Sequence, residues 1–94
     1  MATMIVRLQV EDYETWKREF DGVEGSRQEH GWIRHEVYQD IEDPNAVVIV
    51  NHVPTLEQGK AYFASEPVRE AVARSGIQGA PVIWFLNEEE TNDY

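Results

Sequence analysis

Hydrophobic and polar positions along the chain follow two different periods. Period-two runs rich in β-branched residues are typical of strands, whereas apolar residues three or four apart are typical of helices. The strand pattern covers residues 4–10, 32–39, 46–53 and 82–86. The helical pattern covers residues 12–29, with a break, and residues 55–75. This order predicts an α+β, ferredoxin-like βαββαβ domain, with a four-stranded antiparallel sheet and both helices on one face.

The two helices carry recognisable start and break signals. Asp12 stands where an N-cap belongs, and the glycine at position 22 predicts a break before the helix resumes at residues 26–29. Thr55 and Gln58 form the capping box of the second helix. Residues 65–67 (Ser-Glu-Pro) then interrupt that helix and restart it. We therefore predict that the second helix is split.

The strands differ in how apolar their two faces are. In residues 4–10 the even positions are uniformly apolar, so we expect that face to lie under the helices. Residues 43–45 (Asp-Pro-Asn) predict the turn of a β-hairpin. Residues 77–81 read as a linker, and residues 82–86 are nearly all apolar, which predicts a last strand buried on both faces.

The face of the sheet away from the helices is also expected to be apolar. Its predicted members are Ile5, either Val48 and Val50 or Val47 and Ile49, and rings from Trp32, Tyr38, Trp84 or Phe85. So large an apolar area needs a cover. A second copy stacked sheet against sheet would supply it, and we expect this homodimer to form an α/β barrel with an enclosed cavity.

Composition and charge limit the remaining possibilities. The 94 residues suffice for one domain, predicted over residues 1–88, followed by an acidic tail at 89–94. The net charge of −10 would repel nucleic acid, and a high-salt habitat or ordinary solubility would each explain it. The chain has no cysteine, so thiol chemistry and disulfides are excluded. No run is long enough to span a membrane, and we expect a cytoplasmic protein.

Three segments resemble the dimeric α/β-barrel superfamily, which includes antibiotic-biosynthesis-monooxygenase-like domains and small cyclases. They are residues 12–17 (Asp-Tyr-Glu-Thr-Trp-Lys), residues 43–49 of the hairpin, and residues 65–71 of the split helix. The resemblance spans residues 4–88 and implies the barrel dimer. These segments are scaffold motifs, so they support the fold more than a reaction.

Departures from better-understood members narrow the chemistry that the resemblance implies. Haem-degrading relatives use an asparagine on the first strand and a histidine on the second helix, and this chain has neither. Cyclases of the stress-responsive group place histidines on the first and last strands, which also lack them here. Both activities are therefore disfavoured. No cofactor or metal motif is present.

The candidate catalytic residues are Arg7, His35 and His52. Arg7 lies on the strand face opposite the helices, where it would bind an anionic group of a substrate or form a salt bridge with Glu36. The two histidines lie on the hairpin strands, and the register decides whether they share a face. If the paired residue numbers have an odd sum, the two histidines share a face and could do acid–base work or hold a metal; an even sum would separate them.

The large rings of Tyr38, Tyr62 and Trp84 could line an apolar cavity, and Tyr38 and Trp84 are the candidate substrate-binding residues. Each also fits a purely structural role. The resemblance implies a cofactor-independent monooxygenase or a cyclase that acts on a small aromatic or polyketide-like compound, hydrophobic or anionic, in the barrel cavity. The alternative is a non-catalytic dimer that binds a small molecule or serves as a scaffold.

Overall fold

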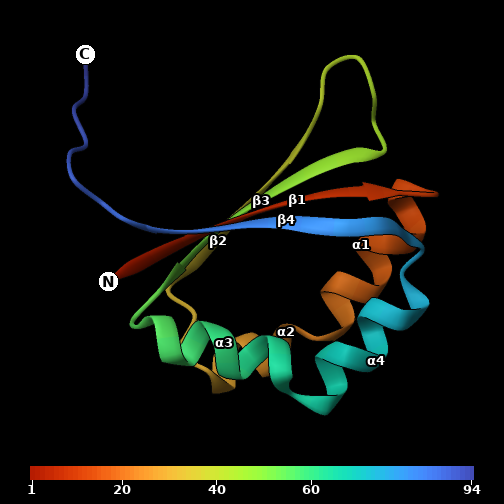
Figure 1. The fold of residues 1–94 in the computed structure, drawn as a ribbon, viewed down its shortest axis with the longest axis horizontal. Coiled ribbons are helices and arrows are strands. Elements are labelled where there is room, and N and C mark those ends of the chain that lie inside the picture. Colours follow the sequence, from red (N-terminus) through yellow and green to blue (C-terminus); the bar gives the residue numbers. More distant parts are fainter.

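The chain folds around one antiparallel sheet with strand order β2-β3-β1-β4, and the computed structural model describes all residues, 1–94. The strands are β1 (Ala2–Val10), β2 (Arg34–Gln39), β3 (Ala46–Val53) and β4 (Ile77–Asn87). The helices are α1 (Tyr13–Gly22), α2 (Glu24–Glu29), α3 (Leu56–Ala64) and α4 (Glu66–Arg74). All four helices lie on one side of the sheet (Figure 1). The predicted ferredoxin-like fold is therefore confirmed.

The helix boundaries follow from local hydrogen bonds. Asp12 caps α1, because its carboxylate accepts hydrogen bonds from the backbone N–H and the hydroxyl of Thr15 at 3.0 and 2.8 Å. Thr55 caps α3 by accepting from the backbone N–H of Gln58 at 3.2 Å. Ser65, in extended conformation, separates α3 from α4. The predicted split of the second helix is thus confirmed, and α2 begins at residue 24 rather than 26.

The core lies between the helices and the even-numbered side chains of β1. Met4 and Val10 are fully buried there, and Val47 of β3 lies opposite Leu8 in the same layer. Gly59 of α3 packs directly on this layer, where an added Cβ would overlap the sulfur of Met4. A glycine at this point lets the helix approach the sheet closely.

The last strand differs from its prediction in two ways. Residues 77–81 belong to β4 instead of forming a linker, and the register with β1 shifts between Arg7 and Gln9. Gly79, with φ of +71°, and Pro81, which has no N–H, make the extra residues of this bulge possible. The prediction that residues 82–86 are buried on both faces is wrong, since these side chains are 39–46% exposed. β4 is an edge strand, hydrogen-bonded to β1 alone.

The end of the chain extends away from the sheet. Residues 88–94 have no regular secondary structure and are exposed. The domain boundary after residue 88 stays a prediction. No helix is both long enough and apolar enough to cross a membrane.

Candidate functional site

The register of the β2–β3 hairpin separates the two candidate histidines. Arg34 lies opposite His52, and His35 lies opposite Asn51, so the paired numbers have an even sum. Side chains alternate between the two faces of a strand. His35 therefore points toward the helices, and His52 points to the open face of the sheet. The structure does not bring them together.

The open face collects Arg7, His52, Tyr38 and Trp84. Arg7 is exposed, and none of the four ion pairs of the structure includes it. The predicted pairing of Arg7 with Glu36 does not form, because Glu36 lies next to His52 instead. The Nε2 atom of His52 is 3.0 Å from Glu36, and Arg34 donates to the same carboxylate at 2.9 Å. Burial would raise the pKa of Glu36, but the hydrogen bonds from His52 and Arg34 outweigh it and lower that pKa.

The centre of the open face is apolar. Ile5 lies opposite Val50 and Trp84, and the register assigns Val48 and Val50, not Val47 and Ile49, to this face. Tyr38 is the second large ring here and is half exposed. Trp32 and Phe85, also considered for this face, lie elsewhere. The Trp32 ring packs on Tyr62 of α3, and Phe85 shares the face of Met4.

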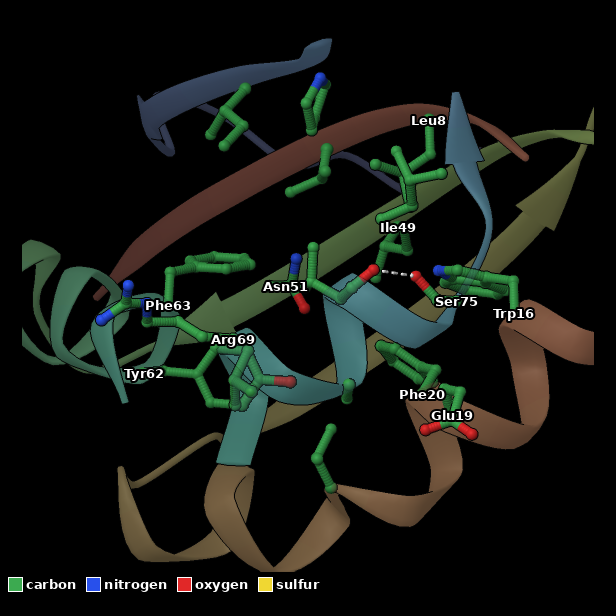
Figure 2. Close-up of a pocket in the computed structure, with 18 residues that line it drawn as sticks. Leu8, Trp16, Glu19, Phe20, Ile49, Asn51, Tyr62, Phe63, Arg69 and Ser75 are labelled. Carbon is green, nitrogen blue, oxygen red and sulfur yellow. Dashed lines mark hydrogen bonds between the residues drawn. The ribbon is translucent and has the colours of Figure 1, made fainter. Parts of the chain in front are cut away.

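A cavity lies on the other side of the sheet, between its covered face and the helices. Its volume is about 370 Å³, and 13 of its 18 lining residues are hydrophobic. Figure 2 shows Trp16 and Phe20 of α1 facing Phe63 and Tyr62 of α3 across this space. The Trp16 and Phe20 rings are stacked with centroids 5.0 Å apart. Sequence reasoning placed the cavity between two sheets, so it missed this one and assigned Trp16 and Phe20 to the buried face of the first helix.

A few polar side chains interrupt the apolar wall of the cavity. Asn51 is 3% exposed, accepts a hydrogen bond from the indole N–H of Trp32 at 3.0 Å, and donates to the carbonyl of Met4 at 3.1 Å. Ser75 donates to the Val72 carbonyl at 2.8 Å. Glu19 is the one carboxylate in the lining. No group of three or more histidine or carboxylate side chains is placed to hold a metal ion.

Tyr62 has the most unusual polar environment in the lining. Its hydroxyl accepts a hydrogen bond from Nη1 of Arg27 at 3.1 Å. Arg27 is itself only 3% exposed, and its guanidinium lies 3.9 Å from the centroid of the Phe20 ring. Burial raises the pKa of Tyr62, and the nearby charge and hydrogen bond of Arg27 reduce that rise. Sequence reasoning considered Tyr62 as a ring that could line a cavity but did not single out Arg27, because a charged position inside an amphipathic helix gives no signal of burial.

His35 lies near this region but does not line the cavity. Its ring meets the edge of Phe20 with centroids 5.1 Å apart. Burial lowers the pKa of His35, and the positive charge of Arg27 lowers it further. The imidazole is therefore favoured in its neutral form.

Comparison with known proteins places this geometry in a family. No curated protein matches the chain. A crystal structure of an antibiotic biosynthesis monooxygenase superimposes with a TM-score of 0.81 at 16% identity, covering 96% of this chain and 100% of that one. A putative antibiotic biosynthesis monooxygenase from Nitrosomonas europaea has a TM-score of 0.75 at 21% identity, covering 94% and 98%.

SnoaB, a cofactor-independent oxygenase from Streptomyces nogalater, has a similar fold. Its TM-score is 0.82 at 12% identity, and the match covers 96% of this chain and 94% of that one. These likenesses establish the fold. Residues 1–74 match the family described as antibiotic biosynthesis monooxygenase, which is more than half of the chain. The chain therefore belongs to the antibiotic biosynthesis monooxygenase family.

Proposed function

We propose that this protein is a cofactor-independent monooxygenase that oxidises a small aromatic compound held between the sheet and the helices. The observation that carries the proposal is the apolar, ring-lined cavity of about 370 Å³ inside a member of this family. Its volume lies in the range typical of small-molecule sites. The cofactor-independent oxygenase SnoaB, with a similar fold, supports this reaction class.

The reaction class sets what such a site must supply. Without a cofactor, the substrate itself provides the electrons that reduce O₂, so it must be an electron-rich ring. Oxidation of a ring CH₂ to a carbonyl is balanced: one oxygen atom enters the product, the other leaves as water, and the substrate gives four electrons. The protein has to bind this ring away from water and orient it. The wall of the cavity is mostly apolar, and Asn51 and Tyr62 offer polar contacts.

A substitution that fills the cavity with a larger side chain tests the proposal. Ala71 of α4 is buried and lines the cavity, whereas Ala73 of the same helix is exposed. We expect Ala71→Phe to lose turnover of a hydroxylated anthrone, and the matched Ala73→Phe to keep it. The assay is oxygen consumption together with mass spectrometry of ¹⁸O incorporated from ¹⁸O₂. Turnover that survives in Ala71→Phe would contradict the proposal.

The same oxygen-consumption assay distinguishes a monooxygenase from the two alternative functions, a cyclase and a non-catalytic binding protein. A cyclase would transform its substrate without consuming O₂. A non-catalytic binding protein would hold the anthrone without transforming it, and binding without turnover would support that reading.

We also propose that the open face is the interface of a homodimer. Val82, Trp84 and Leu86 are each more than 40% exposed there, beside Ile5 and Val50. An apolar surface of this kind is typical of a protein–protein interface. We expect a dimer by analytical ultracentrifugation at micromolar concentration, and a monomer for Trp84→Glu. Ile41, fully exposed in the β2–β3 loop, supplies the control Ile41→Glu, which should remain dimeric.

The open face also contains a second candidate active site. His52 and Glu36 form a close pair there, and Arg7 is unpaired on the same face. A second copy would have to enclose these groups for them to act on a substrate. His52→Ala distinguishes the two locations. Lost turnover in an intact dimer would favour the open face, and unchanged turnover would favour the cavity on the helix side.

A further inference from the structure

We infer that Arg27 gives the cavity a preference for ligands with a negatively charged oxygen, and that it acts through the hydroxyl of Tyr62. This inference rests on the proposed function, because it takes the cavity between sheet and helices as the ligand site. It identifies Arg27 as a positioning residue that determines specificity, although its side chain does not line the cavity.

The first support is the charge of Arg27, which no carboxylate neutralises. Arg27 as a residue is 3% exposed, and the four ion pairs of the structure lie elsewhere. A buried charge without a counter-ion is costly. The face of Phe20 at 3.9 Å and the hydroxyl of Tyr62 at 3.1 Å offset only part of that cost. The site therefore retains a positive electrostatic potential, which an anionic ligand would neutralise.

The second support is the direction in which the hydroxyl hydrogen of Tyr62 must point. An arginine side chain can only donate hydrogen bonds, so the oxygen of Tyr62 is the acceptor in this pair. The hydrogen of that hydroxyl is consequently free, since the hydrogen bond from Arg27 is the one that the Tyr62 hydroxyl makes in the protein. Tyr62 projects from α3 into the lining of the cavity (Figure 2). Its O–H is thus available to a ligand.

The two observations act in the same direction. A hydroxyl that accepts from a cation becomes a stronger donor, since the two hydrogen bonds polarise each other. Its best acceptor is an oxygen that carries negative charge, such as a carboxylate, phenolate or enolate. Arg69 is the competing cation, because it lies in the lining of the cavity. It is exposed, however, so water screens its charge much more than that of Arg27.

Paired probes of the same shape test the inference. 2-Naphthoate and 2-naphthamide differ in charge but hardly in size, and isothermal titration calorimetry at pH 7.5 gives both dissociation constants. We expect the protein to bind naphthoate about tenfold or more tightly than naphthamide. Arg27→Met should remove this preference and change naphthamide binding less than about twofold. Arg27→Lys should restore part of it, and Arg69→Met should leave it in place.

Tyr62→Phe supplies a second variant that keeps the ring and removes only the hydroxyl. It should lose the preference as Arg27→Met does. A spectroscopic readout separates electrostatics from a merely structural role. With tyrosines labelled at Cζ with ¹³C and Tyr62 assigned by its loss in Tyr62→Phe, the pKa of Tyr62 should rise further in Arg27→Met.

The possible outcomes separate this inference from the proposed function. Equal binding of the two probes by the unmodified protein, or an unchanged preference in Arg27→Met, would overturn the inference and leave the proposed function standing. If the preference for naphthoate were lost only in Arg69→Met, the inference would be overturned, because Arg69 and not Arg27 would then determine the specificity. Probes that bind equally well to Ala71→Phe would not occupy the cavity, and that result would count against the proposed site itself.

Discussion

Asn51 holds together the part of the sheet that forms one wall of the cavity, and its replacement by leucine should destabilise the fold. Its amide oxygen is the one acceptor of the indole N–H of Trp32, at 3.0 Å, and its amide nitrogen donates to the Met4 carbonyl, at 3.1 Å. Leucine has a similar size but can make neither bond. The substitution leaves one N–H without a partner and removes a second hydrogen bond.

The magnitude follows from these two losses. The stranded N–H of Trp32, which is only partly buried, costs about 1–2 kcal/mol, and the lost bond to Met4 costs about 1 kcal/mol. The additional apolar surface of leucine returns about 1 kcal/mol. We therefore expect Asn51→Leu to lower the free energy of unfolding by about 1–2 kcal/mol. The assay is urea unfolding followed by circular dichroism, at one protein concentration because a dimer would make stability depend on concentration.

A double-mutant cycle checks that the indole bond is the cause. Trp32→Phe removes the donor, so Asn51→Leu should cost about 1 kcal/mol less in that background. Asn92→Leu in the exposed tail is the matched control and should change stability by less than about 0.5 kcal/mol. The reasoning would be refuted if Asn51→Leu behaved like this control, or if the effects of the two core substitutions were simply additive.

Two further predictions concern close packing and pH. Gly59→Ala should cost about 1–3 kcal/mol in urea unfolding, because its methyl group would overlap the buried sulfur of Met4, whereas Gly25→Ala, with open space around it, should be neutral or slightly stabilising. The pKa of His35 is below its ordinary value of 6.5, so the unfolded chain binds more protons as pH falls through that value. The stability of the protein relative to His35→Gln should therefore decline below about pH 6.5, and a pH-independent difference would contradict the assigned burial.

The fold was predictable from sequence because its signals are local. The N-caps at Asp12 and Thr55 form the predicted hydrogen bonds, and the alternation in β1 correctly separates the buried face from the open one. The burial of β4 was predicted incorrectly because an apolar run does not reveal how many neighbouring strands it pairs with. A central strand and an exposed edge strand can have the same apolar composition. Only the strand order β2-β3-β1-β4 shows that β4 lies at the edge.

The candidate site was much less predictable, because it depends on distances between elements far apart in the sequence. The register that separates His35 from His52 is a property of strand pairing, which one residue of slip would reverse. The contact between Arg27 and Tyr62 joins residues 35 positions apart. No periodicity marks such a pair, since an arginine at the end of a short helix is ordinarily solvated.

The edge strand connects the two proposals, because its alternate side chains serve different surfaces. Ile83 lines the cavity on the helix side, while Val82 and Trp84 on either side of it point to the open face. A second copy packed on Trp84 would restrain β4. It would thereby also hold Ile83 in place in the wall of the cavity. An edge strand paired on one side alone is easily displaced. We therefore expect a monomeric Trp84→Glu variant to bind cavity ligands more weakly than the dimer, although position 84 faces away from them.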